Sequence, residues 1–151
     1  MTFQGTVPVY NGYFIIAGST LAESTFATGS DELCLPMSPQ DSAVVICGAQ
    51  QGDPTVNCTG LDAAPEPLTT VPDGWDEAME VSINPLAPPL ILEPANHSAL
   101  FDGQPLLDHV GWMRIRVLAR GRWAAREDPT LPEAYDITAW PEPHARDTFT
   151  A

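Results

Sequence analysis

With 151 residues, of which 44% are hydrophobic and 17% charged, the chain has the composition of one folded domain and not of a disordered acidic tail. Its formal net charge of −14 comes from the first 113 residues, which carry 14 acids and neither lysine nor arginine, whereas the remaining residues balance six arginines with six acids. This charge disfavours nucleic acid and anionic membranes as partners and favours a cationic partner.

The 16 prolines and 11 glycines favour short strands joined by turns over long helices. The segment Thr6–Ala17 is rich in Val, Tyr, Phe and Ile, which predicts a strand. Asn11-Gly12 in its middle fits either a tight hairpin turn or a bulge in one long strand, because Pro8 weakens the first arm. Ser42–Ala49 is apolar on both faces and predicts a central strand, and Pro54–Thr59 predicts a short strand after it.

The second half of the chain shows clearer alternation. Ala78–Ile83 alternates between apolar and polar residues, and Leu90–Leu92 predicts a short apolar strand. Gly111–Arg122 predicts the best-defined strand, with one apolar face and one face that carries arginines. The apolar face consists of Met113, Ile115, Val117 and Ala119. The opposite face consists of Trp112, Arg114, Arg116, Leu118 and Arg120.

The C-terminal part completes the predicted fold. Trp123–Pro132 predicts a connection with one helical turn, and Glu133–Trp140 predicts the last strand. The polar tail after about residue 141 is expected to be loose. Seven or eight strands without a long helix predict an all-β fold, a single antiparallel β-sandwich domain over residues 1–151. A β-barrel is the alternative.

The arginines of the best-defined strand are the first candidate binding residues. Residues two apart on a strand share a face, so these arginines form a row that begins beside a tryptophan. Trp and Arg are the residue types most enriched in binding hot spots. The candidate partner-binding residues of this face are Trp112, Arg114, Arg116 and Trp140. The alternative is a cross-strand ion-pair ladder with Glu80 and Asp136, in which each exposed pair contributes roughly 0–1 kcal/mol.

A second candidate is the acid-rich segment Asp73-Gly74-Trp75-Asp76-Glu77. Carboxylates in a loop can bind a cation or pair with arginine, and a tryptophan beside them supplies an apolar anchor. We therefore add Asp73, Trp75, Asp76 and Glu77 to the candidate partner-binding residues. The alternative is a solvated turn before the strand that begins at Ala78.

The sequence contains no catalytic signature of the Gly-x-Ser-x-Gly, P-loop or dinucleotide-binding type. The spacing of Cys34, Cys47 and Cys58 matches no zinc site, so we interpret them as packing residues. The loop from Asp102 to His109 contains acids and a histidine, and an enzyme with a carboxylate or metal site there is the rival interpretation. We otherwise expect no catalytic residue, no cofactor and no metal.

Three segments of the chain together form a layout of strand residues that is also found in other proteins. They are Trp75-Asp76-Glu77-Ala78-Met79-Glu80-Val81-Ser82, Gly111-Trp112-Met113-Arg114-Ile115-Arg116-Val117 and Glu133-Ala134-Tyr135-Asp136-Ile137-Thr138-Ala139-Trp140-Pro141. This layout resembles a group of uncharacterised actinobacterial proteins and, more distantly, is similar to the competence-associated nuclease inhibitor family. The resemblance covers the C-terminal half and implies a β-sandwich that inhibits a nuclease by binding it. It assigns no functional residue, and the proline-rich segment from Ala64 to Pro72 departs from it.

These observations predict a non-enzymatic acidic protein that neutralises a basic toxin or nuclease, as an inhibitor or immunity protein does. An acidic surface speeds encounter with such a partner and competes with the partner's anionic substrate. Six arginines against 20 acids predict no nucleic-acid partner and no membrane partner. The first residues lack the pattern of a secretory signal, so a soluble cytoplasmic protein is expected. A structural component of a phage or secretion assembly is the third interpretation.

Overall fold

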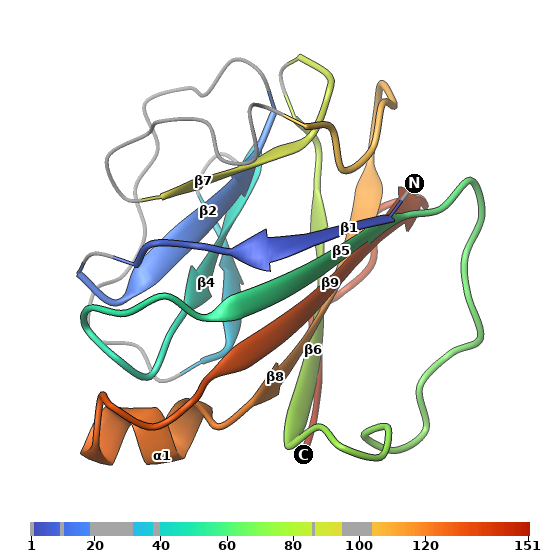
Figure 1. Cartoon of the computed structure of the whole chain (residues 1–151). Helices are drawn as coiled ribbons and strands as arrows, with labels where there is room; N and C mark the ends of the chain where they lie inside the picture. The colour runs from blue at the N-terminus through green and yellow to red at the C-terminus, as the bar shows by residue number, and fades with distance from the viewer. Residues whose placement is uncertain (1, 10, 19–31, 38–39, 86, 95–103) are drawn as a thin grey trace.

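The computed structural model describes all residues except 1, 10, 19–31, 38–39, 86 and 95–103 (Figure 1). The described residues form ten strands and one short helix, which confirms the predicted all-β class. The elements are β1 (Thr2–Thr6), β2 (Tyr13–Ala17), β3 (Cys34–Pro36), β4 (Ser42–Ile46), β5 (Thr55–Gly60), β6 (Glu77–Ile83), β7 (Ile91–Pro94), β8 (Met113–Arg120), α1 (Arg122–Glu127), β9 (Ala134–Pro141) and β10 (Thr148–Thr150).

The described strands form two sheets, neither of which closes into a barrel. One sheet has six strands in the order β1-β5-β9-β8-β6-β10, and the other has four in the order β3-β4-β2-β7. The pairing is antiparallel except between β5 and β9, which are parallel. Figure 1 shows the six-stranded sheet twisting in front of the four-stranded sheet. The predicted purely antiparallel pairing is therefore wrong at this one pair, because β5 and β9 are joined through a long intervening chain.

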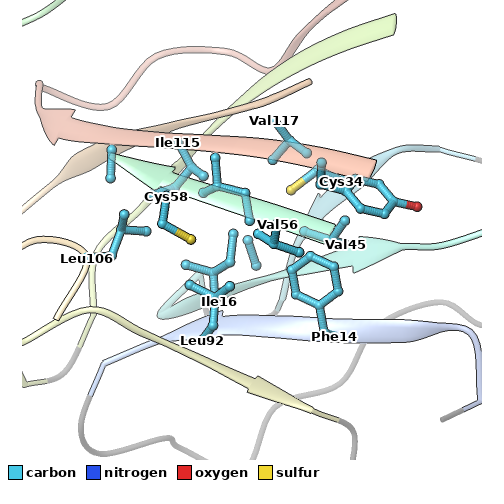
Figure 2. Close-up of a cluster of buried hydrophobic side chains, with 14 of the residues drawn as sticks. Phe14, Ile16, Cys34, Val45, Val56, Cys58, Leu92, Leu106, Ile115 and Val117 are labelled. Carbon is cyan, nitrogen blue, oxygen red and sulfur yellow. The ribbon is translucent and has the colours of Figure 1, made fainter. Parts of the chain in front are cut away.

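Period-two alternation correctly places the core. Met113, Ile115 and Val117 of β8 are buried in one hydrophobic cluster, to which both sheets contribute side chains. Figure 2 shows Phe14 and Ile16 of β2 pointing toward the side chains of the six-stranded sheet. Full burial of each such side chain stabilises the fold by about 1.5–3 kcal/mol. The sheets are thus held together by the inward faces of their strands.

The predicted strand Thr6–Ala17 contains the whole of β2 but shares only Thr6 with β1, and these two strands belong to different sheets. β1 pairs with β5, whereas β2 pairs with β4 and β7. Asn11 and Gly12, with φ angles of 60° and 80°, form a tight turn that carries the chain from one sheet toward the other. The turn is therefore neither a hairpin between paired arms nor a bulge within one strand.

The prediction that the tail is loose is wrong for Thr148–Thr150, which form β10. β10 pairs antiparallel with β6, with Thr148 opposite Glu80 and Thr150 opposite Ala78. Because β6 would otherwise be an edge strand with unpaired main-chain groups, this short strand satisfies part of that edge. A three-residue strand is too short to leave an alternation signal, and the same reason explains why β3 was not predicted.

The predicted helical turn in the connection after β8 is confirmed as α1. Gly121 precedes the helix with a φ of 76°, and a Cβ there would lie 2.3 Å from the carbonyl oxygen of Pro132. Both the left-handed backbone and the close approach require glycine at this position. No helix in the described part of the chain is long and apolar enough to cross a membrane.

Candidate protein-binding surface

The arginines of β8 lie on the face of the six-stranded sheet that is turned away from the core. In the strand register Arg116 is opposite Glu80, and Arg114 is opposite Ser82. The Glu80 carboxylate accepts a hydrogen bond from Arg116 Nε at 2.8 Å and lies 3.5 Å from Arg114 Nε. The predicted ladder is therefore present at Glu80, while Asp136 is opposite Leu118 instead.

The same arginines hold irregular segments of the chain against the sheet. We call residues 61–76, between β5 and β6, the acidic strap, and residues 142–147, between β9 and β10, the tail crossing. Arg116 donates to the Glu66 carbonyl at 3.0 Å, and Arg120 donates to the Gly74 carbonyl at 3.4 Å. Arg114 donates to two carbonyl groups of the tail crossing. The arginine row is thus largely engaged in holding the chain's own main-chain oxygens.

The tryptophans of this face are buried or half-buried and are not open to solvent. Trp140 is only 2% exposed, with the Arg116 guanidinium 5.2 Å from its ring centre. The Trp112 ring meets the His144 ring edge to face at 4.8 Å. The Trp75 ring lies 4.7 Å from the Arg120 guanidinium. Side chains of the acidic strap and the tail crossing therefore pack against this face.

This arrangement corrects the prediction of an open Trp–Arg recognition face. Arg114 and Trp140 are both 2% exposed, so neither can touch a partner in this structure. Trp112 and Arg116 are half-buried. The cover comes from the strap and the tail crossing, two segments whose contacts with β8 have no signature in the strand pattern.

The outward side of the acidic strap carries exposed carboxylates. Asp62, Glu66, Asp73 and Asp76 are all exposed. None of the ion pairs found between described residues involves Asp62, Glu66 or Asp73. Figure 1 shows the strap as a long loop that extends beyond the edge of the strands. The strap is therefore a contiguous stretch of chain with negative charge and no basic residue of its own.

The predicted group Asp73-Gly74-Trp75-Asp76-Glu77 is divided in two by the start of β6. Asp73 and Asp76 are exposed, and Trp75 is half-buried. The Asp76 carboxylate accepts a hydrogen bond from the Gly121 N–H at 2.8 Å, which fixes the end of the strap. Glu77 is 3% exposed and faces away from solvent, so its prediction as a partner-binding residue is wrong.

Glu77 instead forms a buried polar cluster with α1. Its carboxylate accepts hydrogen bonds from Arg122 Nε at 2.8 Å and from Trp123 Nε1 at 2.7 Å. Arg122 also donates to the Ile46 carbonyl at 3.1 Å, which links α1 to the end of β4. The sequence contains a signal for this cluster, since alternation continued back from Met79 places Glu77 on the core face.

The half-buried carboxylate of Glu133 accepts hydrogen bonds from main-chain and side-chain donors. Glu133 accepts hydrogen bonds from the Gly48 and Ala49 N–H groups at 2.7 and 3.2 Å, and from the Tyr135 hydroxyl. Burial, followed by the nearby Cys47 and Glu133, raises the pKa of Tyr135 well above its usual value. These contacts fix the loop after β4 and leave the carboxylate with a structural role.

The described residues do not assemble a metal site. No group of three or more His, Cys, Asp or Glu side chains in the described ranges could hold an ion. In the predicted loop site, Asp102 lies outside the described residues, Asp108 is exposed and His109 is half-buried. Cys34, Cys47 and Cys58 are buried free thiols, and burial raises the pKa of Cys58 to about 12.

Comparison with known proteins gives a structural neighbour and no family. No family model matches the chain, and no curated protein matches it. A solved structure titled "Crocagin biosynthetic gene J" is similar, with a TM-score of 0.58 and 15% sequence identity over 94% of this chain and 97% of that chain. At this identity the similarity shows a shared fold over nearly the whole length and leaves function open.

Proposed function

We propose that this chain is a non-enzymatic β-sandwich protein that binds a basic protein partner through its acidic strap. The observation that carries the proposal is the division of charges at the strap. Arg116 and Arg120 are turned to the strap's carbonyl oxygens, while the carboxylates of Asp62, Glu66 and Asp73 face solvent without an ion-pair partner. The exposed side of the strap therefore carries unpaired negative charge, although Arg116 and Arg120 contact its main chain.

The shape of the strap supports a protein partner. Proline residues at positions 65, 67 and 72 restrict the backbone of the strap, so its carboxylates are presented with less conformational freedom than in a flexible loop. Anchoring by Arg116, Arg120 and Asp76 at separate points has the same effect. A restrained row of carboxylates is complementary to a basic protein surface of the kind that binds nucleic acid.

The narrower form of the proposal is inhibition. A toxin or nuclease needs a basic surface to hold its anionic substrate, and a protein that covers this surface blocks the substrate. An inhibitor or immunity protein of this kind needs no catalytic group.

The test compares two triple variants with equal changes in charge. The strap variant is Asp62→Asn, Glu66→Gln and Asp73→Asn. The control variant changes exposed acids elsewhere, at Asp53→Asn, Asp108→Asn and Glu127→Gln. Each variant removes three negative charges from two aspartates and one glutamate, so any difference between them comes from position.

The first measurement is the affinity for a fluorescein-labelled ten-residue arginine peptide, determined by fluorescence anisotropy. We expect the strap variant to lose about tenfold in affinity at low salt and the control variant much less. All affinities should fall steeply between about 0.02 and 0.3 M salt. Equal losses in both variants would mean that only the diffuse net charge attracts cations and would refute the strap as the binding surface.

The second measurement identifies the partner. Wild type and both variants are used to capture proteins at low salt, and proteins retained by wild type and the control but lost by the strap variant are identified by mass spectrometry. Each is then purified and tested for direct binding and for inhibition of its own activity. A partner with an acidic contact face, or one bound equally by all three proteins, would contradict the proposal.

A further inference from the structure

A pocket of about 250 Å³ lies at the end of the six-stranded sheet where β5 and β9 begin. One wall is the loop between β4 and β5, and the other is the segment that leads from α1 to β9 (Figure 1). Sites for drug-sized ligands usually measure about 300–1,000 Å³. The space in this pocket therefore suits a smaller molecule.

The walls of the pocket are mainly apolar and have little freedom to move. Pro54, Pro129 and Pro132 line it together with Leu131. Each proline ring fixes its own φ angle, which restricts the backbone of both walls. Leu131 is 44% exposed, so an apolar body placed in the pocket would remove part of this side chain from water.

Hydrogen bonds fix the two walls relative to each other. The Thr55 N–H donates to the Glu133 carbonyl at 3.3 Å, and the Ala49 N–H donates to the Glu133 carboxylate at 3.2 Å. Within the second wall, the Asp128 carboxylate accepts hydrogen bonds from the Thr130 N–H at 3.0 Å and from the Thr130 hydroxyl at 2.7 Å. The pocket is thus formed without a ligand, which lowers the entropic cost of binding one.

The charge of the pocket is negative. Among the described residues that line it there are two carboxylates, Asp53 and Glu133, and no lysine or arginine. Asp53 is exposed, and none of the ion pairs found between described residues involves it. The guanidinium of Arg126, on the neighbouring helix α1, lies 4.6 Å from the centre of the Trp123 ring. The pocket is therefore complementary to a positively charged group.

We propose that this pocket binds a small organic cation, namely an amine, amidine or guanidine with a short apolar body. The body would lie against Leu131 and the prolines, and the charged end would pair with Asp53. A metal ion lacks the apolar body and a neutral molecule lacks the charge, so neither uses both features of the pocket. The inference does not depend on the proposed function, because none of the residues that line the pocket belongs to the acidic strap.

The test uses benzamidine as the cation and benzamide as its neutral counterpart of similar shape. Each is titrated into the isotope-labelled full chain, and the amide chemical shifts are followed by NMR. We expect benzamidine to give saturable shifts in residues 49–55 and 129–133. Benzamide should bind at least about tenfold more weakly because it cannot pair with a carboxylate. The guanidinium ion, which has no apolar body, should also bind at least about tenfold more weakly.

Three single variants locate the binding site. Asp53→Asn should lower the affinity for benzamidine about tenfold and leave benzamide binding unchanged. Leu131→Ala should lower the affinity for benzamidine about threefold, because it removes part of the apolar wall. Asp62→Asn, at an exposed acid of the strap, is the matched control and should change neither. Asp53→Asn is also part of the control variant described above, where one carboxylate contributes little to the binding of a peptide with many charges.

Four results would overturn the proposal. The first is the absence of saturable benzamidine shifts up to about 10 mM. The second is equal affinity for benzamidine and benzamide, which would mean that the charge is not recognised. The third is a set of shifts spread over exposed acids throughout the chain, which would show attraction by net charge alone. The fourth is an equal loss of affinity in Asp53→Asn and Asp62→Asn. Because Asp53 and Leu131 are exposed, their variants should keep the fold, which unchanged shifts of the remaining amides would show.

Discussion

Arg114 and Arg122 are equally buried, yet they stabilise different kinds of structure. Each is 2% exposed. Arg122 is paired at 2.8 Å with Glu77, whose side chain is 4% exposed. Arg114 lies 3.5 and 3.9 Å from the more exposed Glu80 and Glu142 and makes its shorter bonds to carbonyl oxygens of the tail crossing. Arg122 neutralises a buried carboxylate. Arg114 holds a surface segment whose carbonyl groups water can hydrogen-bond when the arginine is removed.

This difference predicts unequal costs of removal. A carboxylate that loses its partner inside the protein cannot be solvated, so the protein must unfold, rearrange or protonate it. A carbonyl group of a surface segment can instead be hydrogen-bonded by water. The two arginines are equally buried, so burial alone predicts equal losses of stability. The expected difference comes from the group that each arginine contacts.

The largest effect is expected for Arg122→Met, which leaves Glu77 buried without its guanidinium. We expect the free energy of unfolding, measured by urea titration, to fall by about 3–5 kcal/mol. The double variant Glu77→Gln with Arg122→Met should recover a large part of this loss, because no charge then remains buried. A single variant that loses less than about 1 kcal/mol would show that Glu77 finds another partner.

A smaller effect is expected for Arg114→Gln, which removes charged hydrogen bonds to a segment that can be solvated. We expect a loss of about 2 kcal/mol in the free energy of unfolding. Amide hydrogen exchange should accelerate in residues 145–150 and stay unchanged in α1. If exchange accelerates equally in both regions, the two arginines support one cooperative unit and the distinction drawn above is wrong.

The smallest effect is expected at Asp136, on the same face of the sheet as Arg114. Burial raises the pKa of Asp136, although hydrogen bonds from Thr138 and Asn57 and the charge of Arg116 oppose this shift. A raised pKa means that the folded state holds the proton more tightly than the unfolded state, so the contribution of this carboxyl to stability falls as pH rises through its folded pKa.

The corresponding variant is Asp136→Asn, compared with wild type by urea titration at a series of pH values. Relative to wild type, the variant should gain stability as pH rises from acid to neutral and show a constant difference above that range. A difference that moves in the opposite direction would mean that hydrogen bonding outweighs burial at Asp136.

The inward faces of the strands were predictable because they depend on local alternation. The segments that contain β4, β5, β6, β8 and β9 were all predicted within a few residues, and the apolar face of β8 was correct at every position. The strands β3 and β10 were missed because three residues are too few to show a period. β1 was also missed except for Thr6. Glu77 was assigned to a loop because the predicted strand began at Ala78, one residue too late.

The strand pattern could not predict whether the arginine row is covered by other segments of the chain. Alternation correctly placed Arg114, Arg116 and Arg120 on the face opposite the core, but it could not show that this face is covered. The prediction of Trp140 as a binding residue failed for the same reason. The expected role of Asp73 as a binding residue is compatible with its exposure and is tested by the strap variant. Asp76 is also exposed, and its role stays a prediction.

The sequence by itself determined the all-β class, the inward residues of the main strands and the concentration of negative charge before residue 114, because these are properties of composition and of neighbours along the chain. The tertiary structure decided which arginines are exposed and where the last strand pairs. The physical reason is that Arg114, Arg116 and Arg120 bind main-chain carbonyl groups of segments distant in sequence. Every residue has a carbonyl group, so the amino-acid type at a position does not reveal whether its carbonyl group is bound by one of these arginines.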